Sequence, residues 1–484
     1  MQSFQDSHLY TRLRDTIWTP SQGNSRKSVK WIDGLRGIAS FLVVLTHLAR
    51  AWDYDLFSPR DNEDVPPRVL QWPVLRIPWQ GRIGVTIFAF LTGYVCALKP
   101  LKLARAGEYL GAFKAIAKSA FRRPPRLILP ATIALLISWT MAQFGAFVVA
   151  NRSDCWWCRY AAPDLEDSLS KEVVRLGENF LSTWTTGYMA YDDHQWALLP
   201  LLKASMLVYI LVSATMYVRF RWRVVVYFLL IAYFHQDASK DTETFQIQAI
   251  YGTLLSDLTH HTPFQALLSS PTHRWPRRLI LLLLTTLGLY LASYPGEHPE
   301  YSPWSNSLLT LSPYIFPPEV NIGKRYTAIG VDLLIAAIFL SPSTQHFLSN
   351  RLLLWLGKQS FAVYLVHGTL LRTVLCWVLY GTITGEPWEE GVDENGAPVL
   401  PPYLPLMGPW VVGLGMVGWV GLVYGVAVLW TGWVDPACER LTGWVERKVG
   451  VRGEDGEKGE GNGNGNGEGL PLPLPMQMRP MAVA

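Results

Sequence analysis

Three ionisable side chains lie within or beside one apolar stretch near the start of the chain. Asp33 and Arg36 stand at its beginning, and His47 follows near its end. Ionisable groups are costly in hydrocarbon, so residues of this kind are functional candidates. An imidazole can accept a proton near neutral pH, or it can carry an acyl group covalently. We therefore take His47 as the first candidate catalytic residue; the plainer alternative is a histidine that reaches water at the membrane surface.

The spacing of these residues places them on one face of a helix. Asp33 and Arg36 are three positions apart, which allows them to form an ion pair. Arg36 and His47 are eleven positions apart and return to nearly the same face, roughly 16 Å from each other along the helix axis. One stripe thus carries a cation at one end and an imidazole at the other. Asp33 joins His47 among the candidate catalytic residues.

The composition indicates what surrounds this helix. Of the 484 residues, 50% are hydrophobic and only 17% are charged, against about 25% charged residues in soluble domains. The apolar residues occur in runs and the charges fall between the runs, as in helical membrane proteins. We predict an all-α, polytopic transmembrane bundle of about ten helices. Its predicted spans are 33–51, 83–98, 127–149, 197–218, 224–235, 245–258, 278–294, 326–341, 359–381 and 408–433.

Basic residues indicate the orientation of the bundle, because cytoplasmic loops collect Lys and Arg. The loop between the second and third predicted spans contains Lys99, Lys102, Arg105, Lys114, Lys118, Arg122, Arg123 and Arg126. With that loop inside, ten helices place both termini in the cytoplasm. We expect a multi-pass protein of an endomembrane or the plasma membrane, in contact with membrane lipids. The net charge of +4 gives no reason to expect a nucleic-acid partner, and the oligomeric state stays open.

Three regions follow from this pattern. Residues 1–30 are polar and form a cytoplasmic N-terminal segment, and residues 31–440 form the transmembrane domain. Residues 451–484 are rich in Gly, Asn, Glu and Pro. Such a composition cannot bury a hydrophobic core, so we predict a disordered tail.

The loop 150–196 faces the exterior or the lumen in this orientation. It contains a glycosylation sequon at Asn151 and a Cys-x-x-Cys pair, Cys155 and Cys158. An oxidising compartment allows both glycosylation and a disulfide between the two cysteines. A lone Cys-x-x-Cys lacks the second pair of ligands that a structural zinc site needs, and we predict no metal site.

Further polar residues lie in the later predicted spans. His367 stands in the ninth span, where a lone histidine serves either packing, through hydrogen bonds, or catalysis. We keep it as a secondary catalytic candidate. Asp257 and Asp332 are further intramembrane acids, and Asp332, the more deeply placed of the two, is expected to pair with a basic group.

Four segments occur in a recognisable order. They are DGLRG at 33–37 followed by His47, GVTIFAFLTGY at 84–94, RRPPRL at 122–127 and LGKQSFAVYLVHG at 356–368. Together they resemble the acyltransferase-3 family of membrane acyltransferases, and in detail its fungal members. The resemblance covers about 31–440, and the ordered set is more specific than any single segment.

The resemblance implies transfer of an acyl group, commonly acetyl, from cytosolic acyl-CoA to a hydroxyl of a glycan, a lipid-linked acceptor or a small molecule. Guanidinium groups at the inner face could bind the phosphates of CoA. Arg36, Arg123 and Arg126 are the candidates, and the alternative for Arg123 and Arg126 is ordinary membrane anchoring. The pantetheine arm would extend along the stripe toward His47, with the donor inside and the acceptor outside.

One position departs from the family pattern. The segment that begins Trp196-x-Leu198 normally continues to a glutamate, and Leu201 occupies that place here. Asp193 and His194, just upstream, are the residues that could compensate. Two alternatives to an active enzyme therefore stay open. One is an acyltransferase-like protein that binds lipid or glycan without catalysis, and the other is a secondary transporter that uses the intramembrane ionisable groups as a proton relay.

Overall fold

The computed structural model describes residues 29–236, 243–270, 274–381, 391–392, 398–399 and 403–450. Within these ranges the regular secondary structure is helical, apart from one short pair of strands in which β1 (Gly391–Val392) pairs antiparallel with β2 (Pro398–Val399). The predicted all-α class is therefore confirmed for the described residues. The predicted tail 451–484, and all but the last two residues of segment 1–30, lie outside them.

Among the described residues, seven helices are long and apolar enough to cross a membrane. They are α2 (Lys30–Trp52), α3 (Gly81–Arg105), α4 (Tyr109–Gln143), α8 (Leu198–Thr215) with the turn before it, α12 (Arg274–Ala292), α16 (Arg351–Leu370) with its continuation α17 (Cys376–Tyr380), and α18 (Pro409–Val449). An eighth span is added if α14 (Ile322–Leu340) and α15 (Pro342–Leu348), which meet at 102°, form one broken span. The chain is thus a multi-pass helical membrane protein.

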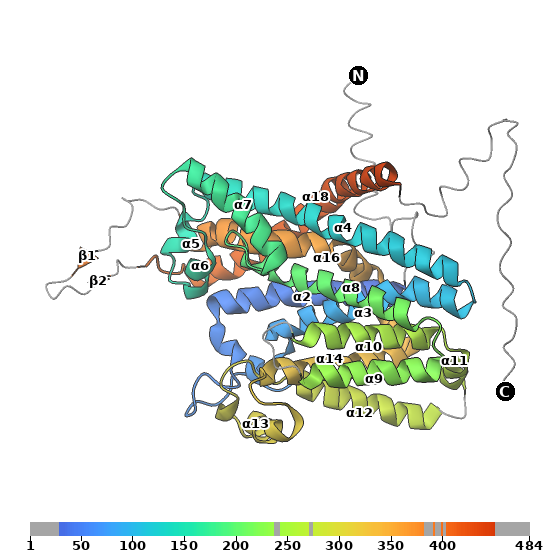
Figure 1. Cartoon of the computed structure of the whole chain (residues 1–484). Coiled ribbons are helices and arrows are strands. Elements are labelled where there is room, and N and C mark those ends of the chain that lie inside the picture. The colour runs from blue at the N-terminus through green and yellow to red at the C-terminus, as the bar shows by residue number, and fades with distance from the viewer. Residues whose placement is uncertain are drawn as a thin grey trace, which may run out of the picture.

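Two of the ten predicted spans correspond to shorter helices. α9 (Phe220–Gln236) and α10 (Glu243–Thr259) have 17 residues each, fewer than the ~20 that usually cross the hydrocarbon core. α10 nevertheless packs against α8, α9 and α14, and both helices lie within the bundle (Figure 1). Each predicted span overlaps a helix, but the number of about ten crossings stays a prediction.

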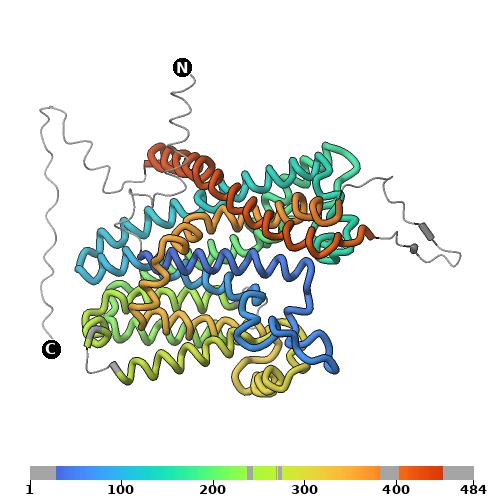
Figure 2. The backbone as a smooth tube through the Cα atoms, turned by 180° about the vertical axis from the view of Figure 1, so that it is seen from behind, coloured from blue at the N-terminus to red at the C-terminus, as the bar shows by residue number. Residues whose placement is uncertain are grey.

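The bundle has two distinct ends and a central helix (Figures 1 and 2). The helices α5 (Val148–Arg152), α6 (Trp156–Ala161) and α7 (Leu169–Thr185) gather at one end, and α11 (Thr262–Ser269) lies at the opposite end. α2 packs against both α16 and α3. Two clusters of buried apolar side chains meet on α2, one shared with α4, α16 and α18 and one shared with α3 and α14. The helix with the predicted stripe is therefore the central element of the bundle.

α2 and α16 approach each other closely because glycines face the partner helix. A Cβ on Gly37 would lie 2.5 Å from the carbonyl oxygen of Leu353, and a Cβ on Gly357 would lie 2.0 Å from that of Asp33. Side chains cannot come so near to backbone atoms, so a larger residue at either position would push the helices apart. These contacts hold α2 against α16, the helix that carries His367.

A π-helical turn interrupts the end of α16. It covers Leu371–Leu375 and leads into α17. Such turns insert an extra residue into a helix and occur often at functional sites. Here the turn places Arg372 fully inside the protein, where a charge without partners would be very costly. The partners of this arginine therefore belong to the description of the site.

The loop 150–196 folds back onto the bundle. A disulfide joins Cys155 and Cys158 at the start of α6, a pairing that the sequence analysis left open. Trp157, between the two cysteines, is buried and stacks on His47 with ring centroids 5.6 Å apart. Asn151 lies in α5 and is half-buried, and its glycosylation stays a prediction. The loop therefore contributes a wall of the candidate site.

Candidate active site

A cavity of about 830 Å³ lies along α2. Residues from α2, α3, α4, α8, α14, α16 and α18 line it. Arg36 and His47 are both among them, so the two ends of the predicted stripe face one space. The cavity therefore follows α2 for the distance between these two residues, roughly 16 Å along the helix.

Three histidines meet at one end of this stripe. His47 comes from α2, His367 from α16, and His194 from the short 3₁₀ turn Asp193–Ala197 that precedes α8. The ring centroids are 4.1 Å apart for His47 and His194, 5.1 Å for His47 and His367, and 4.7 Å for His194 and His367. His194 and His367 are buried, and Trp157 covers the rings of His47 and His194. We call these three residues the histidine cluster.

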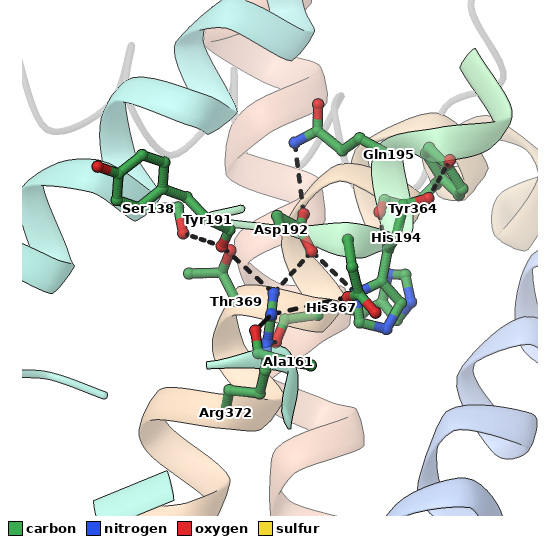
Figure 3. A network of polar contacts seen from close by, with 12 residues as sticks. Ser138, Ala161, Tyr191, Asp192, His194, Gln195, Tyr364, His367, Thr369 and Arg372 are labelled. Atoms are coloured by element: carbon green, nitrogen blue, oxygen red, sulfur yellow. Dashed lines mark hydrogen bonds and ion pairs between the residues drawn. The ribbon is translucent and has the colours of Figure 1, made fainter. Parts of the chain in front are cut away.

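A buried carboxylate and a buried guanidinium orient His194 (Figure 3). Asp192 Oδ1 lies 2.8 Å from His194 Nδ1, and Arg372 Nη2 donates to the same oxygen at 2.8 Å. The side chains of Asp192 and Arg372 are completely buried. Burial opposes ionisation of Asp192, but the hydrogen bond with His194 and the charge of Arg372 outweigh it. The pKa of this carboxyl therefore lies below its ordinary value.

Backbone contacts hold this network in place. Arg372 also donates to the carbonyl oxygens of Ala161 and of Gly368, the latter at 3.2 Å. Ser138 donates to the carbonyl of Tyr191 at 2.7 Å, directly before the buried carboxylate. The hydroxyl of Tyr364 donates to the carbonyl of His194. The orientation of the histidine is thus fixed from α4, α6 and α16 together.

Gly368 allows the loop before α8 to reach α16. A Cβ at this position would lie 2.2 Å from His194 Nδ1 and 2.6 Å from Asp192 Oδ1. Any side chain would therefore displace the carboxylate, the imidazole or both. The glycine one residue after His367 is a structural requirement of the site.

His367 lies behind the other two rings. Its Nδ1 is 2.9 Å from the carbonyl oxygen of Val363 and 3.0 Å from that of Tyr364. Carbonyls only accept, so Nδ1 carries a proton and Nε2 holds the lone pair of the neutral ring. The structure therefore supports hydrogen-bonded packing for His367 and also brings it into the histidine cluster, where it contacts both other members.

Three arginines lie at the other end of the stripe, which we call the arginine mouth. Arg36, Arg123 and Arg126 all line the cavity. Arg36 forms the predicted ion pair with Asp33, at 2.6 Å. Arg126 pairs with Glu439 of α18 at 2.9 Å, and both partners are exposed. The cations predicted from different helices thus line the same cavity.

Asp33 stands far from the histidine cluster. It is separated from His47 by fourteen positions of α2, which corresponds to roughly 21 Å along the helix axis. Its contact is with Arg36. Any part that Asp33 takes in catalysis therefore passes through Arg36, and its direct catalytic role stays a prediction.

Leu201 lines the cavity from α8, so the position that carries glutamate in the family pattern presents an apolar side chain here. Of the two residues expected to compensate, His194 lies against His47, and Asp193 Oδ1 is 3.0 Å from His194 Nδ1. Asp192, which the sequence analysis did not select, makes the shorter contact with His194. The carboxylates of this site therefore come from the loop before α8.

The two other intramembrane acids lie away from the cavity. Asp257 forms buried ion pairs with Arg105, at 2.7 Å, and with Arg223, at 2.5 Å. Asp332 accepts a hydrogen bond from the amide of Gln248 at 2.9 Å. The expectation of a basic partner for Asp332 is thus wrong in this structure, because a neutral amide from α10 occupies that position.

Sequence comparison places the chain among known proteins. A family model described as "Acyltransferase domain" matches residues 29–430. The chain is similar to O-acetyltransferase PaAT-1 of Phomopsis amygdali, with 26% identity over 377 residues that cover 72% of this chain and 73% of the relative. No solved structure matches significantly.

Two further fungal relatives are more distant in identity. Acyltransferase R4 of Phoma sp. (strain ATCC 20986 / MF5453) is 23% identical over 395 residues, covering 71% of this chain and 83% of the relative. Acyltransferase clz18 of Cochliobolus lunatus is 22% identical over 400 residues, covering 72% and 84%. All three matches extend over most of both chains.

Proposed function

We propose that this chain, which belongs to the acyltransferase family matched over residues 29–430, transfers an acyl group from acyl-CoA to a hydroxyl group. Acetyl is the acyl group expected first, because the relative from Phomopsis amygdali is named an O-acetyltransferase. The observation that carries the proposal is the cavity, which has guanidinium groups at one end and imidazoles at the other. The two ends match the phosphates of CoA and the proton transfer that ester formation requires.

The arginine mouth suits the donor. Charge-assisted hydrogen bonds from guanidinium groups to phosphate are strong and can be bidentate. Arg36 and Arg126 are paired with carboxylates, but the two arginine side chains are 37% and 55% exposed. Exposed ion pairs are worth only about 0–1 kcal/mol. A phosphate group can therefore replace these carboxylates at small cost.

At the histidine cluster, an imidazole acts as general base. The acceptor hydroxyl gives its proton to the ring of His47 while its oxygen attacks the thioester carbonyl. The C–S bond then breaks, and the proton passes from the imidazole to the leaving thiolate, so the products are an ester and the CoA thiol. General-base catalysis contributes about 10²–10⁴-fold to a rate. A transient acyl group on His47 would give the same products in two steps.

His194 takes the place of the carboxylate that the family pattern puts at the position of Leu201. Its ring centroid lies 4.1 Å from that of His47, and Asp192 holds its Nδ1. A carboxylate that orients an imidazole and stabilises its protonated form is a recurring arrangement in acyl transfer. We propose that Asp192 fixes the orientation of His194, which packs against His47 in the place of that carboxylate.

The acceptor enters beside the histidine cluster. Arg50, Tyr54, Glu297 and Lys324 also line the cavity, and the hydroxyl of Tyr54 donates a hydrogen bond to Glu297 at 3.0 Å. A lining with both signs of charge suits a molecule rich in hydroxyl groups, such as a glycan, a lipid-linked acceptor or a small metabolite. With the arginine mouth and both termini in the cytoplasm of an endomembrane or plasma membrane, donor and acceptor approach from opposite sides.

Proteoliposomes that contain the purified protein test this function. Acetyl-CoA labelled in the acetyl group is supplied on the side of the arginine mouth, and candidate sugars and a lipid extract are supplied on the other side. We expect label in an acceptor, with one free thiol released for each label transferred. Recovery of intact labelled acetyl-CoA across the membrane would identify a transporter instead. Label that stays in acetyl-CoA on its own side would contradict both functions.

Leu201 supports a second candidate function, a binding protein without catalysis. The variant Leu201→Glu, with Leu201→Gln as its uncharged control, separates the two candidates. We expect no gain in acyl transfer from Leu201→Glu, because Asp192 and His194 already supply the acid–base groups. A gain of tenfold or more over an inactive wild type, absent in Leu201→Gln, would favour the binding protein.

A further inference from the structure

The histidine cluster has a second chemical capacity besides proton transfer. Each of its rings has one buried nitrogen that makes no hydrogen bond to the described residues. These atoms are Nδ1 of His47, Nε2 of His194 and Nε2 of His367. Leaving a buried polar atom without a partner costs about 1–3 kcal/mol. All three belong to rings that pack against one another, which indicates a ligand that binds nitrogen lone pairs.

The spacing of the rings fits a metal ion. One ring nitrogen from each of His47, His194 and His367 lies within 4.8 Å of the other two. Around a tetrahedral Zn²⁺ with Zn–N bonds of about 2.0–2.1 Å, the ligand nitrogens stand about 3.3 Å apart. The χ2 angle of histidine is soft, so ring rotations can close the remaining difference of up to about 1.5 Å at small cost.

The contacts of the other ring nitrogens have the pattern found behind metal ligands. A metal-binding histidine usually donates its second N–H to a carboxylate or a backbone carbonyl. Asp192 is the partner of His194 Nδ1 at 2.8 Å, and Arg372 holds that carboxylate in turn. The carbonyl of Val363 accepts from His367 Nδ1 at 2.9 Å. With Nδ1 engaged in this way, Nε2 of each ring is the nitrogen left to bind a metal.

The site is enclosed on one side and open on the other. Trp157 covers the rings of His47 and His194, with centroids 5.6 and 5.4 Å away. On the open side, His47 and His194 line the cavity. Three protein ligands with a free fourth position facing a cavity are typical of sites that accept an exogenous ligand.

We propose that His47, His194 and His367 bind one divalent transition-metal ion of the Zn²⁺ class. Imidazole nitrogen suits Zn²⁺, Co²⁺, Ni²⁺ and Cu²⁺, whereas Mg²⁺ and Ca²⁺ prefer oxygen. The three residues come from α2, the turn before α8 and α16, so no spacing in the sequence could indicate the site. The sequence analysis predicted no metal site, and this proposal departs from that prediction.

Metal binding at the histidine cluster and the proposed acyl transfer exclude each other. This exclusion rests on the proposed function, whereas the metal site itself does not. A neutral imidazole has one nitrogen lone pair. When that lone pair on His47 binds a metal, it cannot accept the proton of the acceptor hydroxyl. Loading the cluster with Zn²⁺ should therefore inhibit acyl transfer, and a chelator should restore it.

Metal content measures the binding directly. Purified protein is stripped with a chelator, equilibrated with Zn²⁺, desalted and measured by mass spectrometry of the metal. We expect about one Zn²⁺ per chain in the wild type and in the control His346→Ala, whose histidine is exposed on α15. His194→Ala and His367→Ala should each lose most of it. Equal metal in all four proteins, or none in the wild type, would overturn the proposal.

Two further readouts exclude a loss of metal through unfolding. Co²⁺ bound by the wild type should show the strong visible bands of tetrahedral coordination, and these should be absent in His367→Ala under conditions where its helical circular dichroism is unchanged. Asp192→Asn keeps all three ligands but removes the charge behind His194, so we expect Zn²⁺ affinity to fall about 10–100-fold. An unchanged affinity in Asp192→Asn together with an unchanged Co²⁺ spectrum in His367→Ala would contradict a site at this cluster.

The outcomes separate this inference from the proposed function. Transfer by the stripped protein without metal binding would retain the function and overturn the metal site. Metal binding without transfer from acetyl-CoA would retain the site and overturn the function. If acyl transfer required Zn²⁺, the claim that Zn²⁺ and the proton of the acceptor compete for the lone pair of His47 would be wrong.

Discussion

The two ends of the cavity are built in different ways. At the histidine cluster, the carboxylate of Asp192 and the guanidinium of Arg372 are fully buried and bonded. At the arginine mouth, Arg36 and Arg126 are 37% and 55% exposed and form simple surface pairs. Proton transfer requires atoms held within a few tenths of an ångström, whereas attraction of an anion requires only charge. The architecture of each end therefore matches the task proposed for it.

The difference also predicts where mutations destabilise the protein. Removing one partner of a buried ion pair leaves an uncompensated charge and costs about 3–5 kcal/mol. Removing one partner of an exposed pair costs about 0–1 kcal/mol. Mutations at the histidine cluster should therefore lower both the stability of the protein and the rate of transfer. Mutations at the arginine mouth should weaken donor binding alone.

The largest effect is expected from Arg372→Met, which leaves Asp192 without its cation. The free energy of unfolding should fall by about 3–5 kcal/mol, measured by denaturant or thermal unfolding in detergent. The matched control Arg126→Met, at the arginine mouth, should change it by less than about 1 kcal/mol. Partial recovery in the double variant Arg372→Met/Asp192→Asn would show that the unpaired charge is the cause. Equal losses of unfolding free energy in Arg126→Met and Arg372→Met would contradict the proposed difference between the two ends of the cavity.

A smaller effect is expected from Gly368→Ala, which adds a methyl group against His194 and Asp192. Displacement of about 1 Å at a catalytic group can cost 10²-fold in rate, so we expect kcat for acyl transfer to fall about 100-fold. Gly425→Ala in α18 is the control, because a Cβ there meets nothing within 4 Å. The two variants should have similar helical content, and similar kcat values would show that the position of His194 is not critical.

The smallest effect is expected at the arginine mouth. Arg36→Gln removes one charge-assisted hydrogen bond to a phosphate of CoA, worth about 1.5–3 kcal/mol. Part of this loss is offset, because the variant no longer has to break the ion pair with Asp33 before it binds CoA. We expect KM for acetyl-CoA to rise about tenfold with kcat unchanged, measured by thiol release. Arg351→Ala, an exposed arginine at the start of α16, should leave KM unchanged. A fall in kcat instead of a rise in KM would place Arg36 in the chemical step.

The sequence predicted the parts of this site that depend on local geometry. Arg36 and His47 face one cavity because helical periodicity alone sets their common face. The spans follow from apolar runs, although α4 begins at Tyr109, well before the predicted start at 127, because Pro124 and Pro125 do not interrupt it. Prolines are tolerated in membrane helices where neighbours satisfy the freed carbonyls.

The rest of the site could not be predicted because it depends on contacts between distant segments. Asp192 and Arg372 are 180 positions apart, and the loop before α8 reaches α16 only because position 368 is a glycine. One signal was available: Arg372 is an ionisable residue inside the predicted span 359–381. Nothing in the sequence indicated a role for Trp157, because its stacking on His47 depends on how α6 folds back onto the bundle.

The role of His47 is tested most directly by the rate of acetyl-CoA turnover in purified wild type, His47→Ala and the control His346→Ala. Free thiol and labelled product are measured together, with the thermal midpoint as a check on folding. We predict that His47→Ala lowers kcat by about 10²–10⁴-fold, while KM for acetyl-CoA stays within about twofold and His346→Ala behaves as wild type. Equal kcat values in wild type and His47→Ala would contradict the account.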